Sequence, residues 1–102
     1  MRESLIEAHL VKRVKELGGE VRKVKWIGRK GAPDRLVMMP CRPTAVLNTW
    51  DDFEKECLIW VELKATGGKP DPHQLREHAR MRNMGQRVEV IDSIEAVEEL
   101  LT

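Results

Sequence analysis

The chain has 102 residues, a formal net charge of +1 and charged side chains at 34% of its positions, and this length predicts one domain over residues 1–102, since single domains most often run to roughly 100–150 residues. No apolar run approaches the roughly 20 residues of a membrane span, and no signal peptide is visible, so a membrane protein is not expected. Cys41 and Cys57 are far apart and form no C-x-x-C pattern, which indicates neither a disulfide framework nor a zinc knuckle and predicts a reducing, cytoplasmic location.

The first part of the chain predicts one helix and two strands. Residues 2–17 form a helix, because apolar side chains recur there at helical spacing and two glycines follow. Residues 20–26 alternate imperfectly and predict a strand. Residues 28–33 predict a basic turn that contains glycine and proline, and residues 35–39 predict a second strand. The helix should bury one row of side chains: Ile6, Leu10, Val14 and Leu17.

The middle of the chain contains the strongest strand signal. Between residues 40 and 56 the pattern is weak and allows only a short strand at 44–47. Residues 57–64 are apolar on both faces as far as Leu63, which is typical of a central strand that is covered on both sides.

The last third predicts a helix, a strand and a helix. Asp71 and Pro72 are suited to the N-cap and first position of a helix that ends at Gly85. Residues 87–91 predict a strand and residues 93–101 a terminal helix. This order of elements implies an α/β fold with a mixed sheet flanked by helices.

Two charged residues lie at the end of the apolar strand. Glu62 and Lys64 are two residues apart, so both side chains leave the same face. Merely burying a carboxylate and an ammonium would be costly. A metal site explains the pair: Glu62 binds Mg²⁺ through oxygen, and Lys64 positions a water or stabilises charge on a phosphate. The alternative is an ion pair where the strand emerges into solvent.

Asp34 is the second acidic candidate. It follows Gly31-Ala32-Pro33, in which proline fixes the turn and glycine lets backbone approach a ligand, and it directly precedes the strand at 35–39. Ordinary turn chemistry explains a Pro-Asp pair equally well. If the two strands are antiparallel neighbours, however, Asp34 and Glu62 reach the same end of the sheet.

Two further candidates have a structural alternative each. Glu7 borders the apolar face of the first helix and is suited to look into the site, yet Ser4 and Glu7 also fit a capping box. Gln74 is suited to hold a phosphate or a water at the site, yet its spacing from Asp71 also fits a capping pair.

The histidines do not indicate a metal site. His73 and His78 are five residues apart, a poor fit to the i, i+4 pair of a helical zinc site, and we expect both to lie at the surface.

Taken together, these motifs resemble the VRR-NUC family of PD-(D/E)XK nucleases, in particular its short stand-alone phage and bacterial members. The resemblance covers nearly the whole chain. It implies a restriction-endonuclease-like fold and cleavage of DNA phosphodiesters that depends on Mg²⁺ or Mn²⁺. The motifs that carry it are Glu7, Gly31-Ala-Pro-Asp34, Val61-Glu-Leu-Lys64, Lys69-Pro-Asp-Pro-His-Gln74 and the glycine that closes that helix.

The resemblance also implies roles for individual residues. Glu7, Asp34 and Glu62 become metal ligands together with the backbone carbonyl of Leu63. Lys64 becomes the catalytic lysine, and Gln74 becomes a site residue.

The distribution of charge agrees with a nucleic-acid partner. Residues 1–35 carry ten Lys or Arg against five Asp or Glu, whereas residues 36–102 carry eight against twelve. Clustered positive charge is what phosphate neutralisation needs, although ordinary solvated surface gives the same pattern. Arg29, Lys30 and Arg35 flank Asp34 and would hold the DNA backbone.

One domain of this size has room for one active site, whereas resolving a four-way junction needs two related cuts. We therefore expect a homodimer that acts best on branched DNA such as four-way (Holliday) junctions, with residues 41–56 as its interface. A non-catalytic DNA-binding module, or an RNA-cleaving nuclease of the same fold, is the alternative.

Overall fold

The computed structural model describes residues 1–40 and 57–102, which form three helices and four strands. The predicted order of helices and strands is confirmed, and the strand expected at 44–47 lies outside the described residues. The elements in chain order are α1 (Glu3–Glu16), β1 (Glu20–Lys23), β2 (Arg35–Met38), β3 (Leu58–Leu63), α2 (Pro72–Asn83), β4 (Val88–Ile91) and α3 (Ile94–Leu101).

The strands form one mixed sheet in the order β1-β2-β3-β4. The pairs β1–β2 and β2–β3 are antiparallel, whereas β3 and β4 are parallel and are connected through α2. The fold is therefore α/β with helices on a mixed sheet, as predicted. β3 lies in the interior of the sheet, and helices cover both faces of that sheet, which explains why the sequence of β3 is apolar on both faces.

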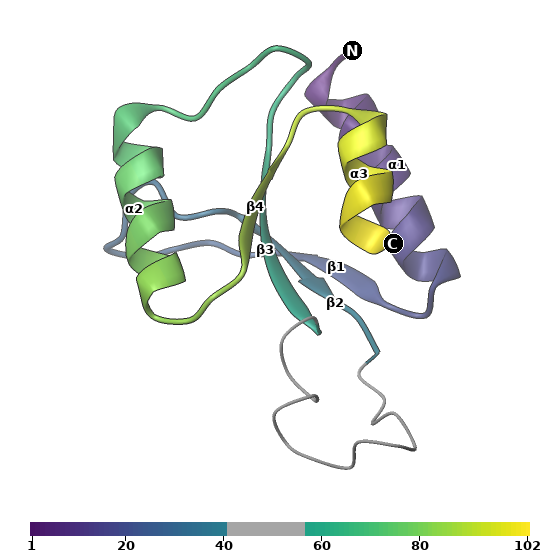
Figure 1. Cartoon of the computed structure of the whole chain (residues 1–102), viewed down its shortest axis with the longest axis horizontal. Coiled ribbons are helices and arrows are strands. Elements are labelled where there is room, and N and C mark those ends of the chain that lie inside the picture. The colour runs from purple at the N-terminus through teal and green to yellow at the C-terminus, as the bar shows by residue number, and fades with distance from the viewer. Residues whose placement is uncertain (41–56) are drawn as a thin grey trace.

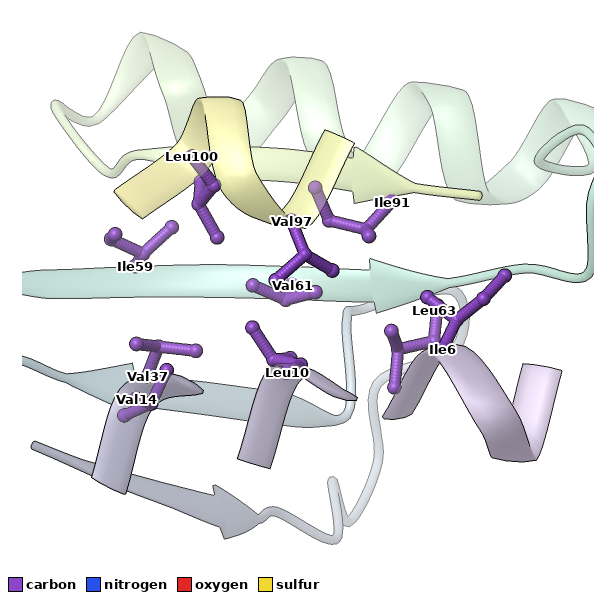
Figure 2. Packing of buried hydrophobic residues seen from close by; sticks show 10 residues of the cluster. All are labelled: Ile6, Leu10, Val14, Val37, Ile59, Val61, Leu63, Ile91, Val97 and Leu100. Carbon is purple, nitrogen blue, oxygen red and sulfur yellow. The ribbon is translucent and has the colours of Figure 1, made fainter. Parts of the chain in front are cut away.

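The helices cover the two faces of the sheet unequally. α1 and α3 lie together on one face, and α2 lies on the other (Figure 1). Ten aliphatic side chains form the core between the sheet and the α1/α3 layer (Figure 2). These residues are Ile6, Leu10, Val14, Val37, Ile59, Val61, Leu63, Ile91, Val97 and Leu100.

Three expectations need correction. Leu17 is 40% exposed rather than buried, because α1 ends at Glu16 and Leu17 occupies the C-cap. β1 ends at Lys23, three residues before the predicted end of that strand. Cys57 is disulfide-bonded, whereas the cysteine pattern indicated no disulfide. No helix within the described ranges is long and apolar enough to cross a membrane.

Candidate active site

The register of β2 and β3 brings two acidic residues together. Arg35 pairs with Val61, so Asp34, one residue earlier, lies opposite Glu62. Opposed residues of antiparallel strands point to the same face, and here it is the face that α2 covers. The juxtaposition that the antiparallel arrangement predicts is therefore present. The Asp34 carboxylate is 56% exposed, whereas that of Glu62 is 10% exposed.

Burial dominates the electrostatics of Glu62. Its pKa is raised to about 7, chiefly because burial disfavours the charged form; the Asp34 carboxylate raises it further, and the Lys64 ammonium lowers it. Oxygen Oε1 of Glu62 is buried and finds no hydrogen-bond partner among the described residues. A carboxylate with an unsatisfied buried oxygen beside a second carboxylate suits a divalent cation, which prefers oxygen ligands.

Lys64 and Leu63 are held at the end of β3 by the neighbouring strand. Leu63 pairs with Ile91 of β4, and the Lys64 backbone N–H donates to the Ile91 carbonyl at 2.9 Å. The Leu63 side chain is buried in the aliphatic core. The metal-ligand role that the resemblance implies for Leu63 belongs to its backbone carbonyl. Lys64 follows the last residue of the strand and is half-buried, close enough to Glu62 to be the main charge that stabilises its carboxylate.

Arg35 connects the two outer carboxylates. Its guanidinium, 13% exposed, forms an ion pair with Glu7 of α1, and its Nη1 lies 3.0 Å from Oδ2 of Asp34. The side chain predicted to hold DNA is thus engaged inside the protein. The capping box proposed for Ser4 is absent, because α1 begins at Glu3 with Arg2 as its N-cap.

The predicted metal ligands are not all gathered in this conformation. Within residues 1–40 and 57–102, no group of three or more His, Cys, Asp or Glu side chains is arranged to hold a metal ion. Glu7 forms an ion pair with Arg35, whereas Asp34 and Glu62 lie opposite each other on neighbouring strands. The two opposed carboxylates fit a cation, and the role of Glu7 as a ligand stays a prediction.

Gln74 forms the capping pair that its spacing allows. The Asp71 backbone N–H donates to Oε1 of Gln74 at 2.8 Å, and Asp71 is the N-cap of α2.

The start of α2 also contacts the loop before Asp34. Gly31 has a φ of 85°, and a side chain there would meet the carbonyl oxygen of His73 at 2.9 Å. Glycine is therefore required for this approach, to protein backbone rather than to a ligand.

His78 contradicts the expectation of a surface residue. It is fully buried, and its Nε2 lies 3.4 Å from Oε1 of Glu62. Neither ring nitrogen has a hydrogen-bond partner among the described residues, and burial lowers the pKa of the imidazole. The available signal was spacing: His78 follows Gln74 by one helical turn and precedes the buried Met81 by three residues, which places all three on one side of α2.

Arg29 and Lys30 are exposed on the loop between β1 and β2. Nη1 of Arg29 lies 3.5 Å from Oε1 of the buried Glu77 of α2, while the arginine side chain stays 46% exposed. Both cations lie on the loop that leads to Asp34, and both are exposed.

Comparison with known proteins gives one curated relative and one solved structure at high similarity. Over 93 residues, the chain is 44% identical to "Putative nuclease p44" of Acyrthosiphon pisum secondary endosymbiont phage 1, a match that covers 91% of this chain and 85% of the relative. It is 39% identical to a solved structure described as "VRR_NUC domain", with a TM-score of 0.73 and coverage of 97% of this chain and 92% of the other. No family model matches the sequence.

Proposed function

This chain belongs to the VRR-NUC family of nucleases, and from that membership we propose that it is a metal-dependent endonuclease that hydrolyses DNA phosphodiester bonds. One observation supports this most: Asp34 and Glu62 oppose each other on neighbouring strands, and the buried Oε1 of Glu62 has no hydrogen-bond partner within residues 1–40 and 57–102. A buried polar atom of this kind costs free energy unless an unseen ligand satisfies it.

The proposed site holds one Mg²⁺ or Mn²⁺ through Asp34, Glu62 and the carbonyl of Leu63, with Glu7 as a further ligand once it leaves Arg35. When bound, the ion supplies Lewis-acid polarisation of the phosphate and a lower pKa for water. Lys64 places its ammonium beside Glu62, where it stabilises negative charge on the phosphate oxygens.

Other groups orient the substrate. Arg29 and Lys30, both exposed near Asp34, hold the DNA backbone through charge-assisted contacts. Gln74, at the start of α2, is proposed to contact a phosphate or a site water through the part of its amide not used in capping.

The preferred substrate that we propose is branched DNA such as a four-way junction, met in replication, recombination or repair in the cytoplasm of a bacterial host. One chain offers one site, so paired cuts require two copies, and a homodimer related by a two-fold axis supplies them with matching symmetry. The expected interface lies at 41–56, outside the described residues.

A cleavage assay tests the catalytic proposal. Asp34→Ala, Glu62→Ala and Lys64→Ala should each lower the cleavage rate of a junction, nick, flap and duplex panel by at least ~10³-fold with Mg²⁺ or Mn²⁺, while circular dichroism stays unchanged. Lys15→Ala removes an exposed lysine from the last turn of α1, outside the site and its motifs, and serves as the matched control. Wild-type turnover in any of the three site variants would refute the role of that residue. Cleavage of RNA but not of DNA would overturn the proposal that DNA is the substrate.

Size-exclusion chromatography with light scattering tests the assembly. We expect a dimer mass at micromolar protein and faster cleavage of a four-way junction than of linear duplex. A monomer mass, together with equal rates on both substrates, would overturn the dimer and the branched-DNA preference.

A further inference from the structure

The loop between β1 and β2, residues 24–34, exposes an apolar side chain beside the candidate site. Ile27 is 93% exposed, more than any other large hydrophobic residue in the described part of the chain. A single exposed apolar residue is ordinary on a flexible or featureless surface. This one is different because the loop around it is anchored.

Hydrogen bonds join the part of the loop before Ile27 to the part after it and hold the loop in place. The indole N–H of Trp26 donates to the Pro33 carbonyl at 2.8 Å, and its ring lies 5.2 Å from that of Trp60 on β3. The Val24 N–H donates to the Asp34 carbonyl at 2.9 Å, so the ends of the loop are joined. Ile27 is therefore presented to solvent by backbone that is fixed on the residue before it.

The charges around Ile27 indicate the kind of partner. Lys25, Arg29 and Lys30 are exposed on the same loop, and Asp34 at its end is the proposed metal ligand. The loop also reaches the start of α2 through the close approach of Gly31 to His73, and it extends from the strand ends toward the side where α2 lies (Figure 1). An apolar tip between cations is complementary to bases flanked by phosphates.

We propose that Ile27 is an apolar wedge that enters an unstacked base step of branched DNA, while Lys25, Arg29 and Lys30 hold the adjacent phosphates. The inference rests on the proposed function, which identifies DNA as the partner. It adds to that proposal the residue that distinguishes branched DNA from continuous duplex. Separating stacked bases is costly in continuous duplex and much less so where stacking is already interrupted. The wedge thus favours branch points near the site over uniform duplex.

Binding with Ca²⁺ in place of Mg²⁺, on DNA carrying 2-aminopurine at the branch point, tests the wedge without cleavage. Wild type should raise the fluorescence of a four-way junction and bind it more tightly than linear duplex. Ile27→Ala should abolish most of the rise and bring the ratio of junction to duplex affinity down by ~10-fold, through the lost burial of apolar surface against the bases. Met84→Ala, which truncates a residue 65% exposed at the opposite end of α2, is the matched control and should behave as wild type.

The outcomes separate the two proposals. Equal fluorescence and equal affinity ratios for Ile27→Ala and wild type would overturn the wedge even if cleavage is observed. A wedge signal in a wild-type protein that cuts no DNA would overturn the nuclease proposal and leave the wedge standing. Failure of wild type to bind any DNA would overturn both.

A second, independent observation concerns His78. Among the described residues, neither of its ring nitrogens has a hydrogen-bond partner, nor does Oε1 of Glu62, and Nε2 lies 3.4 Å from that oxygen. Shortening this one distance to the ~2.9 Å of an ordinary hydrogen bond would satisfy both buried atoms. The other charged groups around the imidazole are Arg82, Glu77 and Lys64.

The geometry assigns His78 the role of a positioning residue, which donates from Nε2 to one lone pair of Glu62 Oε1 and leaves the second lone pair of that oxygen available to the cation. This inference also rests on the proposed metal site. Groups that orient a metal ligand typically change metal affinity by 10–100-fold when removed. His78→Gln keeps an N–H donor in the place of Nε2, whereas His78→Leu fills the space without one.

Calorimetric titration with Mn²⁺ measures the effect. His78→Leu should weaken binding by ~10–100-fold, and His78→Gln should restore most of the affinity. Nitrogen NMR of wild type should show that Mg²⁺ shifts the His78 Nε2 resonance, which needs no variant to fold. Equal affinities for the Leu variant and wild type, or a resonance unmoved at saturation, would overturn the role. Asp34→Asn, which leaves His78 and Glu62 intact, should lose Mn²⁺ affinity; retention there would refute the metal site instead.

Discussion

The two faces of the sheet bury different kinds of side chain. Beneath α1 and α3 the described core is wholly aliphatic. Beneath α2 the described part of the chain buries three ionisable side chains, and two of them have atoms that find no hydrogen-bond partner there. Burying polar groups costs free energy unless they are satisfied. The comparison shows that burial on the aliphatic face stabilises the fold, whereas the buried polar groups of the candidate site on the α2 face lower the free energy of unfolding. The three polar groups are Glu62, Glu77 and His78.

The largest effect on stability should come from the aliphatic face. Leu10 is fully buried, so Leu10→Ala should lower the free energy of unfolding by about 2–5 kcal/mol, through lost burial and a cavity. Leu5→Ala, on the same helix but 56% exposed, should change it by less than about 0.5 kcal/mol. Urea denaturation measures both values. A cost below about 1 kcal/mol for Leu10→Ala would contradict the assignment of stability to this face.

On the α2 face, one substitution should stabilise the metal-free protein. The pKa of Glu62 is raised to about 7 from 4.5, so the folded state binds this proton more tightly than the unfolded state. The stability of wild type therefore falls as pH rises from about 4.5 to 7, and the penalty is complete above that range. Glu62→Gln has no such penalty and should be more stable at pH 8 by up to about 3 kcal/mol.

Denaturation in EDTA across pH 4 to 8 measures this difference, and Glu98→Gln is a control of opposite sign. Hydrogen bonds from Arg13 and His9 lower the pKa of Glu98, with that of Arg13 the larger influence. Glu98 thus contributes stability above its unfolded pKa that is lost as pH falls. A gap between Glu62→Gln and wild type that does not grow with pH would contradict the burial penalty.

Divalent metal should reverse the penalty on the α2 face. A ligand that binds only the folded state adds about 2.7 kcal/mol at a hundredfold excess over its Kd. We expect the Tm of wild type to rise with Mn²⁺ and to rise much less in Asp34→Asn, which keeps the shape of the side chain without its charge. An equal rise in both proteins would show that no metal site involves Asp34.

The smallest effect concerns the start of α2. Because Gln74 accepts a hydrogen bond from the Asp71 backbone, Gln74→Ala should cost about 1 kcal/mol of stability. Arg76→Ala, exposed on the first turns of the same helix, should cost less. Thermal denaturation and cleavage rates measured on both variants separate capping from catalysis. A fall in rate for Gln74→Ala at full folding would support its proposed role in the site.

Local patterns in the sequence determined the helices, the strands and the meeting of two carboxylates. The spacing of Ile6, Leu10 and Val14 fixes the buried side of α1, and the doubly apolar stretch before Glu62 requires a central strand. Antiparallel pairing then places Asp34 opposite Glu62, because strands that run in opposite directions bring the start of one to the end of the other. These features depend on residues that are close in the chain, or on the antiparallel pairing of two neighbouring strands.

Tertiary structure alone decided which groups those residues face. His78 is buried because the connection from β3 to β4 lays α2 across the sheet, and its spacing from Gln74 and Met81 does not by itself show that this mostly polar helix covers the Glu62 carboxylate. Arg35 turns to Glu7 because α1 lies on the opposite face from α2 (Figure 1). Contacts between residues 16 or more positions apart, such as His78 with Glu62, depend on how layers pack, and neither hydrophobic period nor motif spacing carries that information.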